Sequence, residues 1–232
     1  MFKNSKKTIL NAGRALGLYV VCLALFSTFL QAQNTHSDSS AKKRSLYFGV
    51  GIGMGYTTVR GDIYGHRALI RPSASLMIQH KFLGKNQLLY KVTYRSFGRN
   101  YRPYVVNNIG YNSYFQLQFA GFSATYLRAI GLKKSFWAGV GFSGERLLQD
   151  RTVTVGKDGS RYSYANSESY NSMNWGGHLV GQYQFQIAKH LKTTIELEYS
   201  LGVSNLLAPV AIQLTGRQVY SNGLFLNAGV FF

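Results

Sequence analysis

The chain has few cysteines, prolines and acidic residues. Its 232 residues include one cysteine, three prolines and eight acids, against 26 lysines and arginines. The single cysteine, Cys22, excludes a disulfide within the chain, and no set of thiolates is available for a zinc site. The scarcity of acid leaves a formal net charge of +18, so we expect an anionic partner.

Long hydrophobic runs are also lacking, apart from residues 15–26, and this run is short for a membrane-spanning helix. The small Ala32 follows the run, and four basic residues precede it: Lys3, Lys6, Lys7 and Arg14. This order is typical of a secretory signal peptide over residues 1–32, with a single anchoring helix as the alternative. Residues 33–44 are small and polar, and we expect a flexible periplasmic lead-in there. An exported, cysteine-free mature protein would meet outer-membrane lipid and lipopolysaccharide, and we expect no nucleic-acid partner.

The chain does contain alternation of apolar and polar residues at period two. Eight segments show it: 46–58, 68–82, 87–97, 113–127, 135–146, 173–187, 191–201 and 218–232. Period two is the pattern of a β-strand with one apolar face. We predict an all-β fold, an eight-stranded antiparallel up-and-down transmembrane β-barrel over residues 45–232 of a bacterial outer-membrane protein. A soluble β-sandwich or lipocalin-like barrel is the alternative, because its strands alternate too.

The connections between these segments alternate between tight turns and longer loops. With an even number of strands, both barrel ends and the tight turns lie on the periplasmic side, and the long loops are extracellular. This topology places outward-facing aromatic residues in two rings, one near each membrane surface. The periplasmic ring has Phe48, Phe82, Phe136, Phe185 and Phe232, and the outer ring has Tyr56, Tyr94, Trp175, Tyr199 and Tyr220.

The segment over residues 113–127 changes its apolar face midway. Its apolar residues lie first on one face and then on the other: Phe115, Leu117 and Phe119, followed by Phe122, Ala124 and Tyr126. A β-bulge near residues 120–121 would bring both halves to the same side of the sheet.

The last strand ends the chain on an aromatic residue. One apolar row runs along it at period two: Leu224, Leu226, Ala228, Val230 and Phe232. Such a row suits a strand that closes a barrel against lipid. It also resembles the C-terminal signal that the outer-membrane insertion machinery reads, so we expect that machinery as a partner.

The faces assigned to the lumen carry charges of both signs. Buried charges are tolerated when they are paired, so we predict a lumenal ion-pair network of six residues: Lys91, Arg95, Glu145, Glu196, Glu198 and Arg71. The alternating glycines of the first strand would make room for the long side chains. Because so narrow a barrel has little free space, we favour a structural plug. The alternative is a gated polar path, biased toward anions by Arg71, Lys81 and Lys192.

The long loops combine basic residues with tyrosines, which suits lipopolysaccharide phosphates or a partner protein as well as a simple solvated surface. The basic residues include Arg60, Arg67, Arg99, Arg102, Arg146, Arg151, Lys157, Arg161 and Arg217. We expect no enzyme, cofactor or metal site. Among the histidines of the barrel segment, only His66 has an acid close in sequence, Asp62, and no nucleophile motif accompanies the pair.

Three stretches carry a resemblance to the PorT-like outer-membrane β-barrel family typical of Bacteroidetes-type bacteria. They are the glycine-alternating residues 50–56, the aromatic residues 114–119 and the Trp-Ala-Gly-Val-Gly stretch at 137–141, together with the Phe-ended last strand. The resemblance implies an eight-stranded outer-membrane barrel, and some relatives act in protein export. We therefore expect a structural or partner-binding role, including lipopolysaccharide binding. The alternatives are a small solute or ion pore and an accessory component of secretion.

Overall fold

The computed structural model describes residues 46–61, 67–82, 85–131, 135–165, 169–188 and 190–232. These residues belong to one compact unit, Arg44–Phe232. The predicted signal peptide over 1–32 and lead-in over 33–44 lie outside the described residues and stay predictions.

The described residues form one antiparallel sheet of ten strands. Its strands are β1 (Leu46–Gly61), β2 (Arg67–Phe82), β3 (Asn86–Asn100), β4 (Tyr104–Val106), β5 (Ile109–Ile130), β6 (Phe136–Gly156), β7 (Arg161–Tyr164), β8 (Met173–Ala188), β9 (Leu191–Gly202) and β10 (Val219–Phe231). Eight of them close into a ring in the order β1-β2-β3-β5-β6-β8-β9-β10, because β10 pairs with β1 and β5 pairs with β6. The predicted eight-stranded antiparallel barrel is confirmed.

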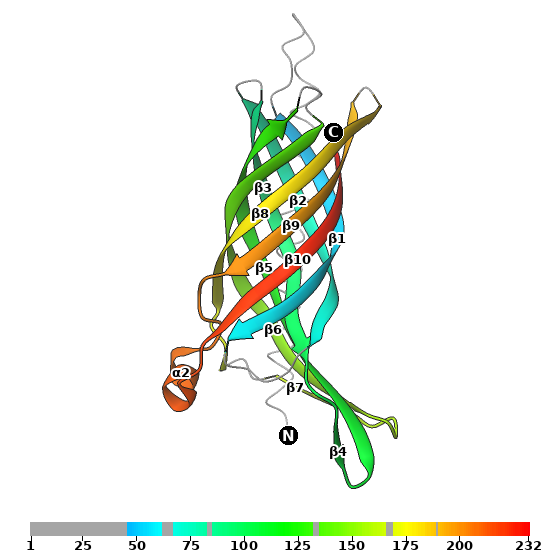
Figure 1. The fold of residues 1–232 in the computed structure, drawn as a ribbon, viewed down its shortest axis with the longest axis vertical. Helices are drawn as coiled ribbons and strands as arrows, with labels where there is room; N and C mark the ends of the chain where they lie inside the picture. The colour runs from blue at the N-terminus through cyan, green and yellow to red at the C-terminus, as the bar shows by residue number, and fades with distance from the viewer. Residues whose placement is uncertain (1–45, 62–66, 83–84, 132–134, 166–168, 189) are drawn as a thin grey trace, which may run out of the picture. The chain divides into compact units, whose positions relative to one another are not determined.

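The two ends of the barrel differ (Figure 1). At the turn end, where the chain terminates, consecutive strands β2 and β3, β5 and β6, and β8 and β9 approach each other closely. At the opposite, loop end, β5 and β6 continue past the ring and pair with β4 and β7. We call residues 104–113 and 152–164 the extension. The short helix α2 (Pro209–Thr215) also lies at the loop end; no described helix is long and apolar enough to cross a membrane.

The predicted bulge at residues 120–121 is wrong. β5 pairs with β3 in unbroken register from Asn86↔Arg128 to Asn100↔Tyr114. The register shift lies between β5 and β6, where Gln118 faces Gln149 and Phe119 faces Leu147, so the extra residue belongs to β6. No switch of face is needed in β5, because its first apolar residues point into the barrel and the later ones point outward.

Two apolar clusters fill the interior near the two ends of the barrel. The loop-end cluster consists of Val59, Phe97, Phe115, Leu117, Phe119, Leu206, Val219 and Phe225. The turn-end cluster consists of Met77, Leu89, Leu127, Ala129, Trp137, Val180 and Phe231. The β1 glycines admit the rings of these clusters: a Cβ on Gly49 would lie 2.7 Å from Phe231 Cδ1, and one on Gly55 would lie 2.5 Å from Phe225 Cδ1. The prediction that these glycines make room for the long charged side chains is therefore corrected at Gly49 and Gly55, because β10 places Phe231 and Phe225 opposite them.

The outer face of the ring is apolar and exposed. Ile52 is 73% exposed, and Met54 and Leu226 face outward beside it on β1 and β10. Exposed aromatics follow at the loop-end side, including Tyr56 and Trp175, and at the turn-end side, including Phe136 and Phe185. Polar residues are buried inside, which reverses the distribution of a water-soluble protein.

Candidate functional site

A charged layer lies in the middle of the barrel, between the two apolar clusters. Lys91 and Arg95 are four residues apart on β3, so period-two alternation points both inward. Glu196 and Glu198 are their counterparts on β9, which lies half-way round the ring from β3. Glu145 comes from β6, between these two strands. The ion pairs therefore join strands that share no backbone hydrogen bonds.

Lys91 and Arg95 share Glu198. Lys91 Nζ lies 2.5 Å from Glu196 Oε1 and 3.0 Å from Glu198 Oε2. Arg95 Nη1 lies 2.6 Å from Glu198 Oε1, and Arg95 Nε pairs with Glu145 Oε1. All five side chains are at least nine-tenths buried. Five of the six predicted residues are thus brought together, with three carboxylates facing two cations.

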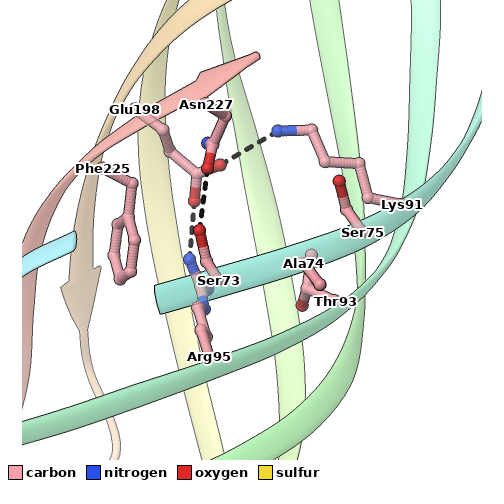
Figure 2. A pocket seen from close by; sticks show the side chains of 9 residues that line it. All are labelled: Ser73, Ala74, Ser75, Lys91, Thr93, Arg95, Glu198, Phe225 and Asn227. Atoms are coloured by element: carbon pink, nitrogen blue, oxygen red, sulfur yellow. Dashed lines mark hydrogen bonds and ion pairs between the residues drawn. The ribbon is translucent and has the colours of Figure 1, made fainter. Parts of the chain in front are cut away.

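Amides and hydroxyls complete the charged layer, and sequence reasoning did not single them out. Asn174 Nδ2 donates to Glu145 Oε2 at 2.9 Å, and Asn227 Nδ2 donates to Glu196 Oε1 at 3.1 Å. Ser73 Oγ in turn donates to Asn227 Oδ1 at 2.9 Å (Figure 2). A signal for Asn227 exists in the sequence, since it is the one amide on the inward face between Phe225 and Phe231.

The guanidinium of Arg95 also contacts the loop-end cluster. Its Cζ lies 5.4 Å from the centre of the Phe97 ring and 5.1 Å from that of Phe225, within cation–π range. Figure 2 shows Phe225 and Arg95 beside the ion pairs. The charged layer is therefore continuous with apolar packing on its loop-end side.

Little free space remains around the charged layer. A cavity of about 20 Å³ is lined by Lys91, Arg95, Glu198 and Phe225, among others, and one of about 10 Å³ is lined by Glu196 and Asn227, among others. Each has room for about one water molecule. Glu196 Oε2 is buried without a protein partner, so a water in the smaller cavity would satisfy it.

Arg71 does not belong to the network, contrary to the prediction. Its Cζ lies 5.0 Å from the centre of the Tyr114 ring, and none of the ion pairs among the described residues includes it. The register between β2 and β3 shifts between Ala68 and Ala74, around Arg71. The alternation of apolar and polar residues along β2 does not reveal this shift, because the shift concerns the pairing of β2 with β3.

Some of the remaining candidates lie in the barrel, and others lie outside the described residues. His178 faces the lumen, with Nε2 at 2.7 Å from Thr125 Oγ1. His66 and Asp62 lie outside the described residues. Within the described ranges, no group of histidine, cysteine or acidic side chains is arranged to hold a metal ion. Arg99, predicted in a loop, is instead buried near the end of β3.

The extension carries some of the exposed basic and aromatic residues expected of the loops. Lys157 and Arg161 are exposed on it, and Arg151 is exposed immediately before it on β6. Tyr104 stacks on Tyr111 with ring centres 5.5 Å apart, while Tyr162 and Tyr164 are about half exposed. Asp158 is the acid of the extension, and it accepts hydrogen bonds from the backbone and hydroxyl of Ser160.

The row at the C-terminus faces away from the lumen. Leu224, Leu226 and Ala228 are exposed on the outer face, and Val230 and Phe232 are partly exposed. Phe232 exchanges backbone hydrogen bonds with Phe48, which ties the end of the chain to β1.

No family model and no curated protein matches the chain. Solved structures do match it at low identity. Ail, the attachment invasion locus protein of Yersinia pestis, is 12% identical over 82% of this chain and 100% of its own, with a TM-score of 0.41. Neisserial surface protein A is 10% identical over 82% and 98%, with a TM-score of 0.41. The outer membrane protein AlkL, solved in lipid bilayers, is 8% identical over 85% and 95%, with a TM-score of 0.40.

Proposed function

We propose that this protein is an integral outer-membrane β-barrel with a side-chain-plugged lumen, and that it binds lipopolysaccharide through its loop end. The observation that carries the proposal is the reversed distribution of polarity around a closed ring. Exposed apolar residues surround the outside, while charged and amide side chains are buried inside.

The apolar outer face favours hydrocarbon over water as the surrounding medium. A closed barrel satisfies every ring strand on both edges, which is the requirement for β-structure in lipid. A soluble barrel would instead bury its apolar face in the lumen, and here the middle of the lumen holds ion pairs. Exposed Ile52, Leu226 and Leu179 would have no cover in water.

Membrane integration is tested on the mature protein in isolated outer membranes. We expect it to stay in the membrane fraction during an alkaline carbonate wash and to need detergent for solubility. Release by carbonate, or a monodisperse protein in detergent-free buffer, would contradict the proposal.

Three layers of side chains along the barrel support the proposal of a plugged lumen. The loop-end cluster, the charged layer and the turn-end cluster fill successive levels, and the cavities beside the charged layer hold about one water each. We expect no conductance in planar bilayers, either from the wild type or from Glu196→Gln and Arg95→Gln variants that remain folded. Channels whose selectivity or gating responds to either substitution would favour the pore instead.

The loop end supports a binding role because it presents fixed positive charge on a rigid scaffold. The extension is a continuation of two ring strands, so its basic residues are held by backbone hydrogen bonds. Arginine and lysine bind phosphate oxygens, and tyrosine adds contact area with little loss of side-chain freedom. Lipopolysaccharide supplies phosphates at the outer surface, where the predicted orientation places the extension.

The binding test uses a triple variant, Arg151→Gln, Lys157→Gln and Arg161→Gln, with purified lipopolysaccharide as the probe. We expect the wild type to bind and the triple variant to lose about tenfold or more in affinity, as expected from removing several charge-assisted contacts. The control is Lys85→Gln with Arg128→Gln, two exposed basic residues near the turn end. Equal binding by the triple variant, or a wild type that does not bind, would contradict the role.

A further inference from the structure

Two lysines converge at the turn-end mouth of the barrel. Lys81 comes from β2 and Lys192 from β9, and β1 and β10 lie between these strands in the ring. Both ammonium groups lie over the Tyr47 ring, Lys81 Nζ at 5.4 Å and Lys192 Nζ at 5.1 Å from its centre. The two groups are close enough to interact with each other. Two side chains that carry like charge when protonated are therefore held side by side.

Aromatic rings form the inner boundary of this lysine pair. Lys81 Nζ lies 5.9 Å from the Trp137 ring centre, and Lys192 Nζ lies 5.5 Å from that of Phe231. Trp137 and Phe231 belong to the turn-end cluster and are buried, whereas both lysines are partly exposed. The ammonium groups consequently lie against the rings of the turn-end cluster, on side chains that are themselves partly exposed.

The carboxylates of the charged layer are engaged elsewhere. Glu145, Glu196 and Glu198 pair with Lys91 and Arg95 on the far side of the turn-end cluster's rings. Lys192 Nζ donates to an amide oxygen, Gln79 Oε1, and no ion pair among the described residues includes Lys192. The Lys192 ammonium group is thus contacted by aromatic rings and an amide oxygen.

Gln79 adds a further donor. Its side chain is fully buried, its oxygen accepts from Lys192, and its Nε2 has no hydrogen-bond partner. A buried donor without a partner is costly, so it indicates an absent acceptor. Ammonium and amide N–H groups can only donate hydrogen bonds. A cluster of such donors therefore suits an anion with several acceptor oxygens.

We propose that Lys81, Lys192 and Gln79 form a binding site for a phosphate group at the turn-end mouth. A tetrahedral oxyanion would accept from both ammonium groups, relieve their mutual repulsion and take the free Gln79 donor. The phosphate can belong to a free phosphorylated solute or to a phospholipid head group. The site lies at the opposite end of the barrel from the extension, so it is independent of lipopolysaccharide binding there.

Trp137 provides the readout, because it contacts Lys81. The chain has two tryptophans, so a Trp175→Phe background leaves Trp137 as the single tryptophan, which is excited selectively over the tyrosines at the red edge of its absorption. The full mature protein is titrated with inorganic phosphate in a zwitterionic detergent, at ionic strength held constant with chloride. We expect a saturable change in Trp137 emission, with a midpoint raised about tenfold or more by Lys192→Gln or Lys81→Gln. Lys85→Gln, at an exposed position near the same end, should leave the midpoint unchanged.

A second arm separates the two sources of phosphate. The same protein in nanodiscs of phosphatidylcholine is compared with nanodiscs containing phosphatidylglycerol. If anionic lipid already fills the site, added inorganic phosphate produces no further change in phosphatidylglycerol discs, whereas a free solute site titrates equally in both. If Lys192→Gln fails to fold, Lys192→Met replaces it, because methionine keeps the packing of the aliphatic part of the lysine side chain. A response that never saturates, or an identical midpoint in the folded Lys192 variants, would overturn the proposal.

Discussion

Glu198 is the residue on which the charged layer depends most. It is the one carboxylate that pairs with both cations, Lys91 at 3.0 Å and Arg95 at 2.6 Å. Attraction between buried charges offsets their desolvation only when each charge keeps its partners. Removing Glu198 would leave two cations facing Glu145 and Glu196 alone, so its loss should be felt by both ion pairs at once.

Replacing Glu198 by glutamine is therefore expected to lower the free energy of unfolding by about 3 kcal/mol or more, the range for breaking a buried pair. The measurement is urea-induced unfolding in detergent or lipid, with the free energy extrapolated to zero denaturant. Asp158→Asn is the matched acid-to-amide control, because Asp158 is exposed and should change stability by about 0.5 kcal/mol or less. A loss below about 1 kcal/mol for Glu198→Gln would contradict the prediction, because it is the range of an ion pair that is exposed to water.

At the scale of the element, β10 separates two tasks between adjacent aromatic residues. Phe231 points inward and is fully buried in the turn-end cluster, whereas Phe232 faces outward and is partly exposed. Alternation along one strand thus assigns the first ring to packing. We expect the second ring to be the one that the insertion machinery reads, as the sequence predicts.

Alanine substitutions should distinguish these two tasks. Phe231→Ala is expected to cost about 3–5 kcal/mol of folding stability, the range for a buried phenylalanine. Phe232→Ala should leave stability in lipid nearly unchanged, but reduce the amount of barrel inserted in cells. Unfolding in vitro and quantification of the outer-membrane fraction provide the two measurements. Normal insertion of Phe232→Ala would contradict the role of the terminal aromatic.

The sequence predicts the elements better than it predicts their inner contacts. All eight alternating segments are ring strands. The pattern identifies them because alternation at period two arises when the two faces of a strand lie in different environments. The inward position of Phe115, Leu117 and Phe119 was missed because an apolar residue of a barrel strand can face either lipid or an apolar interior cluster. The ion-pairing residues were predicted from their inward faces and scarcity of acid. The exclusion of Arg71 depends on the register between neighbouring strands, which the alternation of a single strand does not specify.

At the scale of the whole molecule, apolar contact with the surroundings replaces a single apolar core. The interior clusters lie at the two ends of the barrel, and the ion pairs occupy the level between them. Ile52, in the outward-facing middle of the ring, is the most exposed large hydrophobic residue among the described residues, at 73%. In lipid this surface needs no partner, and a charge placed on it must be desolvated.

Ile52→Arg tests the medium around the ring directly. Ile52 lies near the middle of β1 and faces outward, so a charge there would enter the hydrocarbon and cost about 2–4 kcal/mol in a bilayer. Val105→Arg is the control, because Val105 is 70% exposed on the extension, outside the ring. Reversible folding into phospholipid vesicles measures both variants. If hydrocarbon surrounds the ring, Ile52→Arg loses stability while Val105→Arg stays within about 0.5 kcal/mol of the wild type. Equal, small effects at the two positions would mean that water surrounds both.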